Sequence, residues 1–235
     1  MPVKQTVVLR TLAGSRAYNL HTEDSDHDYH EVAVVPTADM LRTGAVKPDK
    51  LLHWDESDDN DCQRWEIGHF LRLALRCNPT ILETFAAPIT VGGDTRVGLE
   101  MRGLLPHVLS QKAVRKAFLG YATNQRAKLF KKPDDPTLAK LGDRALKFAQ
   151  QYLRVLMTGE RLLRTGELVI DMQKINCAGF LKGIKEGDYT LGYLIDRAVD
   201  WECEFFRAYD KRMLPEEPDV AAVDDFLLKV RREYW

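Results

Sequence analysis

The sequence of 235 residues has few cysteines, no long apolar run and almost no net charge. Its four cysteines lie far apart and form no CxxC pair, which argues against a disulfide framework or a zinc knuckle and fits a reducing cytosol. No apolar run approaches the roughly 20 residues of a membrane-spanning helix. The first ten residues, MPVKQTVVLR, lack the apolar core of a signal peptide. The composition therefore predicts a cytoplasmic protein with no membrane partner.

Lys and Arg number 34 and Asp and Glu number 35, so the formal net charge at pH 7 is −1. This balance carries no overall basic signature of a nucleic-acid-binding protein, and any such contact would need a local patch. Hydrophobic residues make up 45% and charged residues 29% of the chain, as in ordinary globular proteins. The length suits one large domain or two small ones with a sizeable core.

Short segments rich in β-branched residues indicate strands in the first half of the chain. Residues 6–12 (TVVLRTL) and 29–35 (ending in VAVV) have the composition of strands, and the apolar tail of the second suggests burial on both faces. Residues 51–54 predict a third strand. The segment ILETF, 81–85, fits either a strand or one helical turn, because short apolar runs do not distinguish the two.

Apolar spacing of i, i+3, i+4 and i+7 predicts amphipathic helices after Trp65 and throughout the second half. The predicted helices start near residues 65, 110, 141, 191 and 218. The segment KKPDDPT, 131–137, reads as a linker because it holds two prolines and four charges. The predicted fold class is α/β (α+β). A core with a small mixed sheet spans residues 1–108, and a helical bundle spans residues 109–235.

The stretch AGSRAYNLHTEDSDHDYHEVAVV, 13–35, crowds acidic residues and histidines against a predicted strand. Asp24, Asp26 and Asp28 form D-x-D-x-D, which also opens a calcium-binding EF-hand loop. That loop needs glycine at its sixth position and glutamate at its twelfth, where this sequence has tyrosine and valine. A zinc site is disfavoured because His27 alternates with Asp26 and Asp28 along an extended segment and points away from them. A solvated polar turn is the remaining simple interpretation.

Two features favour a nucleotide site over a solvated turn. In an extended segment Asp26 and Asp28 point to one face, and like charges beside a buried sheet are unfavourable unless a cation bridges them. The turn at Gly14 and Ser15 follows a strand and offers backbone N–H groups and a hydroxyl to a phosphate. Magnesium binds through one or two carboxylates together with substrate phosphates. The pattern therefore predicts a site for Mg²⁺ or Mn²⁺ and a nucleoside triphosphate.

These residues resemble known motifs. The glycine–serine pair followed ten residues later by DxD resembles the nucleotidyltransferase superfamily of DNA polymerase beta. GSRAYNLHTEDSDHDY, 14–29, looks like the GSRAYGLxTPxSDxDYRG motif of a bacterial and phage family of predicted nucleotidyltransferases that includes RNA-ligase-associated polymerases (RlaP). FLRLALRCNPTILETF, 70–85, is similar to the family's FLxLALKxNPxxLELLF. QKAVRKAFLGYATNQ and LRVLMTGERLLRTGEL look like its two downstream helical motifs, so the resemblance covers about residues 5–185.

The resemblance implies roles for individual residues. Gly14 and Ser15 match the phosphate-binding turn, and Asp26 and Asp28 match the metal-binding pair. Two residues compete for the third carboxylate, with a slight preference for the first: Asp61, which leads a predicted strand, and Glu83, in the NPxxLE segment. Candidate contacts to the triphosphate or base are Arg16, Lys112, Tyr121, Lys147 and Arg154. Tyr121 could equally well be a core residue. Lys147 and Arg154 could equally well lie on a solvated helix face.

The resemblance implies metal-dependent transfer of a nucleoside monophosphate from a nucleoside triphosphate, with ATP expected, to an acceptor hydroxyl, and release of pyrophosphate. An RNA 3′ end is the acceptor that the family suggests, although the near-neutral charge argues against a large RNA footprint. A protein hydroxyl (AMPylation) and a small molecule are alternative acceptors. An idle nucleotide-binding or interaction module is the alternative function. It would fit the polar segment CQRW after Asp61 and Gln151, where relatives often carry His.

Overall fold

The computed structural model describes residues 5–42, 53–57, 61–129 and 142–235. The chain divides into two compact units. The first comprises residues 1–109 together with 218–235, and the second comprises residues 110–217. None of the described helices is long and apolar enough to cross a membrane. The predicted linker at 131–137 lies outside the described residues.

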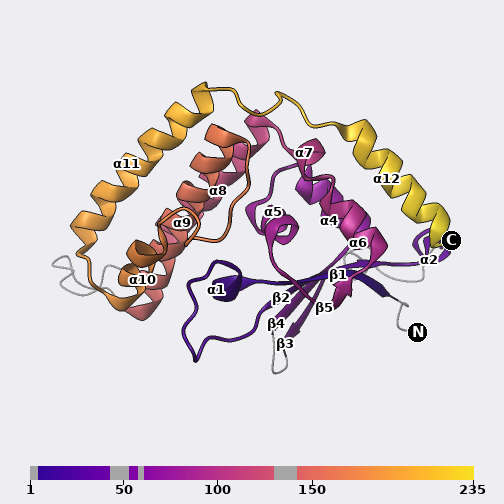
Figure 1. The fold of residues 1–235 in the computed structure, drawn as a ribbon, viewed down its shortest axis with the longest axis horizontal. Coiled ribbons are helices and arrows are strands. Elements are labelled where there is room, and N and C mark those ends of the chain that lie inside the picture. Colours follow the sequence, from indigo (N-terminus) through magenta and orange to yellow (C-terminus); the bar gives the residue numbers. More distant parts are fainter. Residues whose placement is uncertain (1–4, 43–52, 58–60, 130–141) are drawn as a thin grey trace. The chain divides into compact units, whose positions relative to one another are not determined.

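A five-stranded mixed sheet forms the centre of the first unit, in the order β3-β4-β2-β1-β5 (Figure 1). Strand β2 pairs parallel with β4, and the other neighbours are antiparallel. The apolar tail of β2 is completely buried, as the sequence predicted. The strands are β1 (Thr6–Leu12), β2 (Tyr29–Val34), β3 (His53–Ser57), β4 (Asp61–Glu66) and β5 (Ile89–Asp94).

Seven labelled helices complete the described part of the first unit. They are α1 (Gly14–Ala17), α2 (Thr37–Met40), α4 (Ile67–Ala74), α5 (Pro79–Ala86), α6 (Arg96–Arg102), α7 (Leu105–Val108) and α12 (Val220–Glu233). The segment that fitted a strand or a helical turn belongs to helix α5. Asn78 Oδ1 caps this helix by accepting from the Ile81 N–H at 3.4 Å, and Pro79 occupies its first position.

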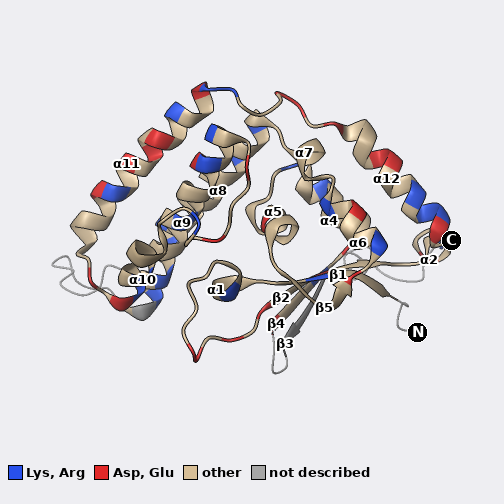
Figure 2. Ribbon diagram, viewed as in Figure 1, with Lys and Arg blue, Asp and Glu red and all other residues tan. Residues whose placement is uncertain are grey.

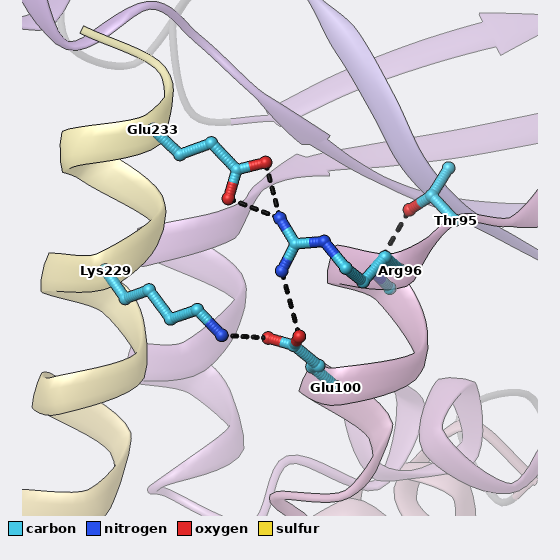
Figure 3. Close-up of polar contacts among 6 residues, drawn as sticks. Thr95, Arg96, Glu100, Lys229 and Glu233 are labelled. Carbon is cyan, nitrogen blue, oxygen red and sulfur yellow. Dashed lines mark hydrogen bonds and ion pairs between the residues drawn. The ribbon is translucent and has the colours of Figure 1, made fainter.

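Helix α12 packs on α4 and α7 and therefore belongs to the first unit, whereas the sequence grouped it with the helical bundle. Its last turn is ion-paired with α6 (Figure 3). Arg96 bonds to Glu233 and, at 2.9 Å, to Glu100, and Lys229 reaches Glu100 at 2.7 Å. The first unit thus runs to residue 109 and resumes at residue 218.

In the described part of the second unit, three helices pack around α9. The helices are α8 (Gln111–Leu129), α9 (Asp143–Thr165), α10 (Ala178–Glu186) and α11 (Leu191–Asp210). Helix α9 contacts each of the other three. A Cβ atom at Gly159 would lie 2.7 Å from Phe118 and 2.6 Å from Phe205, so the glycine allows close helix packing. Thr190 caps α11, because its hydroxyl accepts from the Tyr193 N–H at 3.3 Å.

Candidate functional site

The turn after β1 is built against the segment that leads into β2. The Ala13 N–H donates to the Asp28 carbonyl at 2.8 Å, which joins the two segments. Gly14 opens the short helix α1 with a φ of +58°, in the left-handed region. A Cβ atom there would overlap Asp28 Oδ2 and lie 3.1 Å from its Cγ. Both the dihedral angle and the contact require glycine, and they place the Gly14–Ser15 backbone beside the Asp28 carboxylate.

Asp26 and Asp28 lie in the loop before β2, because the strand begins only at Tyr29. The strand thus begins where the sequence predicted, and the two aspartates precede it. Asp26 is exposed and Asp28 is half-buried. The loop is held by Arg16, whose Nη2 donates to the Ser25 carbonyl at 2.7 Å and whose Nε donates to the Asp26 carbonyl at 3.1 Å. Arg16 thus supports the loop that carries the candidate metal ligands.

Asp61 is the first residue of β4 and is exposed. Strand β4 runs parallel to β2 with Tyr29 opposite Cys62, so the residues just before this pair are Asp28 and Asp61. Parallel neighbours begin at the same edge of a sheet, and this register brings the two positions to that edge. The strand predicted to follow Asp61 is present as β4.

Glu83 lies on α5 and is only 6% exposed. The Tyr18 hydroxyl donates to its Oε2 at 2.5 Å, and Tyr18 is the C-cap residue of α1. The bond therefore ties the glycine–serine turn to α5. A carboxylate held inside the unit in this way is better suited to fix the turn than to meet a metal at the surface. Of the two candidates for the third carboxylate, the topology favours Asp61.

Three residues beneath the turn were absent from the predicted site: Tyr18, His30 and Thr84. His30 Nδ1 lies 3.0 Å from Thr84 Oγ1, and its ring meets that of Trp65 edge-on. Burial lowers the pKa of His30 to about 4, and the nearby Glu83 carboxylate opposes this shift. The imidazole is therefore neutral at pH 7. The sequence signals for these residues were the segments that hold them: Tyr18 and His30 lie in the stretch 13–35, and Thr84 lies in the segment 70–85.

Within the described part of the chain, no group of three or more His, Cys, Asp or Glu side chains is gathered tightly enough to hold a metal ion. A preformed cage of the kind that binds calcium or zinc is thus absent there. The hard oxygens of Asp26 and Asp28, beside a turn rich in backbone N–H groups, do fit Mg²⁺ or Mn²⁺. Magnesium commonly binds to one or two carboxylates and takes its other ligands from substrate phosphates and water.

The remaining candidates belong to the helical unit. Lys112 is exposed and ion-paired with Glu216 at 2.7 Å and Glu217 at 3.3 Å, and these carboxylates raise the pKa of its ammonium group. Tyr121 is half-buried.

Lys147 and Arg154 are seven residues apart on α9 but differ in environment. Lys147 is exposed, whereas Arg154 is 1% exposed and donates through Nε to Gln151 Oε1 at 2.9 Å. Their description as a shared solvated face therefore applies to Lys147 alone.

Comparison with known proteins identifies a family. The model of the RlaP family, described as an RNA repair pathway DNA polymerase beta family, matches residues 3–182. Among solved structures, a nucleotidyltransferase-like protein from Exiguobacterium sibiricum 255-15 matches with a TM-score of 0.31 and 11% sequence identity. That match covers 99% of this chain and 75% of the other. No curated protein matches the sequence.

Proposed function

The chain belongs to the RlaP family of DNA polymerase beta-type nucleotidyltransferases, and on this premise we propose that it transfers a nucleoside monophosphate to an acceptor hydroxyl. The hydroxyl oxygen forms a bond to the α-phosphorus of a nucleoside triphosphate. The bond from that phosphorus to the oxygen bridging the β-phosphate breaks, pyrophosphate leaves with the bonding electron pair, and the hydroxyl proton passes to solvent. An RNA 3′ end is the proposed acceptor, in line with the family's description.

The observation that carries this proposal is the packing of Gly14 against Asp28. It sets the backbone N–H groups of the first turn of α1, which have no acceptor within a helix, directly beside a carboxylate. Backbone N–H groups bind phosphate oxygens, and Ser15 adds a hydroxyl. A triphosphate bound by the turn would therefore bring its charge next to Asp28, and the two anions would repel each other unless a cation lay between them.

Asp26, Asp28 and Asp61 would hold that cation, proposed to be Mg²⁺ or Mn²⁺. When bound, the metal neutralises phosphate charge and lowers the pKa of the attacking hydroxyl. The chain's own contribution is positioning. Arg16 fixes the loop of Asp26 through two backbone carbonyls, and the Tyr18–Glu83 bond fixes the turn. Positioning and charge neutralisation account for most of the catalysis of phosphoryl transfer.

One observation supports a second candidate, a nucleotide-binding module that does not transfer. The described residues hold no ready-made cluster of three metal-ligating side chains. Under this alternative the nucleotide would bind at the Gly14 turn, and pyrophosphate would not be released.

The test is to incubate the full chain with each of the four α-³²P-labelled nucleoside triphosphates, Mg²⁺ and total cellular RNA or lysate. We expect label in RNA and release of pyrophosphate, both abolished by EDTA and by Asp26→Asn or Asp28→Asn. Asp24→Asn is the matched control, because Asp24 is an exposed acid of the same loop. Label in protein or in small molecules would replace the RNA acceptor. Nucleotide binding without pyrophosphate release from any acceptor would establish the idle module.

A further inference from the structure

Charge is divided unequally between the two compact units. Residues 110–217 contain 20 Lys and Arg against 15 Asp and Glu, and the rest of the chain contains 14 against 20. The helical unit therefore carries a formal charge of +5 and the first unit −6. Helix α8 has five basic residues and no acidic residue in its 19 positions. Figure 2 shows the basic residues of α8 and α9 in blue. The overall charge of −1 thus conceals a basic helical unit.

Part of this positive charge surrounds one aromatic ring, where the end of α8 meets the first turns of α9. Lys128 Nζ lies 5.5 Å and Arg144 Cζ 5.7 Å from the centre of the Phe148 ring. Lys147 is the neighbour of Phe148 in the chain and is exposed, as are Lys128 and Arg144. Phe148 itself is half-buried. These four residues form what we call the Phe148 patch.

The cations of the Phe148 patch differ from two other basic residues of α8, Lys112 and Arg126, which are ion-paired. Lys112 is paired with Glu216 and Glu217, and Arg126 lies 3.9 Å from Glu202. By contrast, no ion pair joins Lys128, Arg144 or Lys147 to a carboxylate among the side chains that the structure describes. Lys128 and Arg144 lie over one ring, and Lys147 follows Arg144 by three residues on α9. Like charges held close together repel each other, and a polyanion would relieve this repulsion.

We propose that the Phe148 patch binds single-stranded RNA, the acceptor strand of the proposed transfer reaction, and the proposal rests on that function for the identity of the strand. Lys128, Arg144 and Lys147 would contact phosphates, and a base would stack on Phe148 or on the Arg144 guanidinium. A basic surface with an aromatic side chain is the usual design of sites for single strands, because every base has a stacking face. The small size of the patch agrees with contact to a few nucleotides.

An acidic protein segment would satisfy the cations but would leave Phe148 without a stacking partner. Rigid double-stranded RNA is also less suitable, because its bases are already stacked on one another and cannot reach the ring. The combination of a half-buried ring with cations that have no ion pair among the described side chains therefore favours an unpaired strand.

The experiment measures binding of the full chain to a fluorescein-labelled 12-nucleotide uridine oligoribonucleotide by fluorescence anisotropy, without nucleotide or metal. In Lys128→Glu/Arg144→Glu/Lys147→Glu we expect at least a tenfold weaker Kd at about 100 mM salt. Each phosphate contact contributes about −0.7 to the slope of log K against log salt for a single strand. We therefore expect the slope to decrease in magnitude by roughly 2 in the triple variant. Phe148→Leu should weaken binding about fivefold while keeping the salt slope.

The matched control is Lys174→Glu/Lys185→Glu/Lys211→Glu, which reverses three exposed lysines of the same unit and changes the net charge equally. It should change Kd less than threefold. Equal losses in the two triple variants would show that only net charge matters and would overturn the proposal. Equally tight binding of a 12-residue polyglutamate peptide would also overturn it, in favour of an acidic protein partner.

Two further variants separate folding and chemistry from binding. Lys128→Gln/Arg144→Gln/Lys147→Gln removes the charge without reversing it, and it should retain the wild-type Tm while binding weakly. Asp26→Asn/Asp28→Asn should bind the oligonucleotide as wild type does, because the assay needs neither metal nor transfer. A chain that binds RNA through the patch but transfers no nucleotide would refute the proposed function alone. A chain that labels RNA equally well without the patch would refute the patch alone.

Discussion

Gly14 packs so closely against Asp28 that the carboxylate occupies the space of a Cβ atom at position 14. The φ of Gly14 is also positive, at +58°. The two constraints are separable, because Gly92 has a φ of +78° and nothing within 4 Å of the corresponding Cβ position. Comparing alanine substitutions at Gly14 and Gly92 therefore separates the free-energy cost of backbone strain from the cost of displacing Asp28.

Gly14→Ala should abolish nucleotide transfer and lower the stability by more than backbone strain alone. A left-handed alanine costs about 1–2 kcal/mol, which is the whole expected effect of the control Gly92→Ala. At position 14 the methyl group must also push the Asp28 carboxylate aside. Urea unfolding and titration with ATP and Mg²⁺ measure the two effects. If Gly14→Ala bound and transferred as well as Gly92→Ala does, the contact with Asp28 would have no role in the site.

The Tyr18–Glu83 bond predicts that these residues position the turn. Tyr18→Phe removes a buried hydrogen bond to a carboxylate, which costs about 1.5–3 kcal/mol, and should raise the KM for the triphosphate. Glu83→Gln keeps an acceptor oxygen for the Tyr18 hydroxyl, and so should leave the Mg²⁺ concentration for half-maximal activity unchanged.

Asp61→Asn is the comparison for Glu83→Gln. We expect it to raise the Mg²⁺ requirement at least tenfold, because Asp61 lies level with Asp28 on the neighbouring strand. A raised Mg²⁺ requirement in Glu83→Gln, with none in Asp61→Asn, would exchange the two roles.

Local signals in the sequence predicted much of the fold, because its strands and helices carry their own periodicity. Thr6–Leu12 and the capped helix α11 match closely. The predicted α/β class agrees with the mixed sheet of the structure, and the predicted family agrees with the family model that matches residues 3–182. Short apolar runs were ambiguous, and the structure makes the segment 81–85 part of α5, which Asn78 caps and Pro79 opens. The return of α12 was not predictable, since its amphipathic pattern does not specify which surface covers it.

For the candidate site, too, the sequence predicted individual residues but not the contacts between distant segments. Gly14 and Asp28 were recognisable from spacing, but the contact between them depends on a hydrogen-bonded junction of two segments. Glu83 was conspicuous as a carboxylate, and its bond to Tyr18 connects residues 65 apart in the sequence. No local pattern encodes such a pair. The Phe148 patch was equally hidden, because a near-zero total charge masks a basic unit.

His30 should make stability depend on pH. Its pKa is about 4 in the folded chain and about 6.5 in the unfolded chain, so between these values the unfolded state binds more protons. Stability from His30 is therefore fully present above pH 6.5 and is lost as the pH falls toward 4. The total is roughly 3 kcal/mol, from 1.36 kcal/mol per pKa unit. Urea midpoints at pH 7.5, 6.5, 5.5 and 4.5 measure it.

The control for His30 is His30→Asn, whose amide can still bond to Thr84. Carboxylates also titrate in this pH range, but wild type and His30→Asn contain the same carboxylates, so their effect cancels in the comparison. The difference in unfolding free energy between wild type and His30→Asn should thus shrink or invert as the pH falls from 6.5 to 4. A constant difference across this range would mean that His30 does not titrate abnormally.

The attachment of α12 to the first unit should depend on one buried ion pair. Arg231 Nη2 lies 2.6 Å from Glu66 Oε1, and the Glu66 side chain is fully buried while it also accepts the N–H groups of Gly68 and His69. Arg231→Met would leave the Glu66 carboxylate buried without its cation. Removing one partner of a buried pair costs roughly 3–5 kcal/mol, so we expect a loss of this size in urea unfolding.

The ion pairs of Figure 3 are exposed and can be compared with the Glu66–Arg231 pair. The side chains of Arg96 and Glu233 are 54% and 39% exposed. Exposed ion pairs contribute little, since water and salt already screen the charges. Arg96→Met should therefore change the Tm by less than Arg231→Met does. The double variant Glu66→Gln/Arg231→Met should recover much of the lost stability, because it removes the unpaired buried charge. If Arg96→Met proved the more damaging change, the surface network and not the Glu66–Arg231 pair would hold α12 in place.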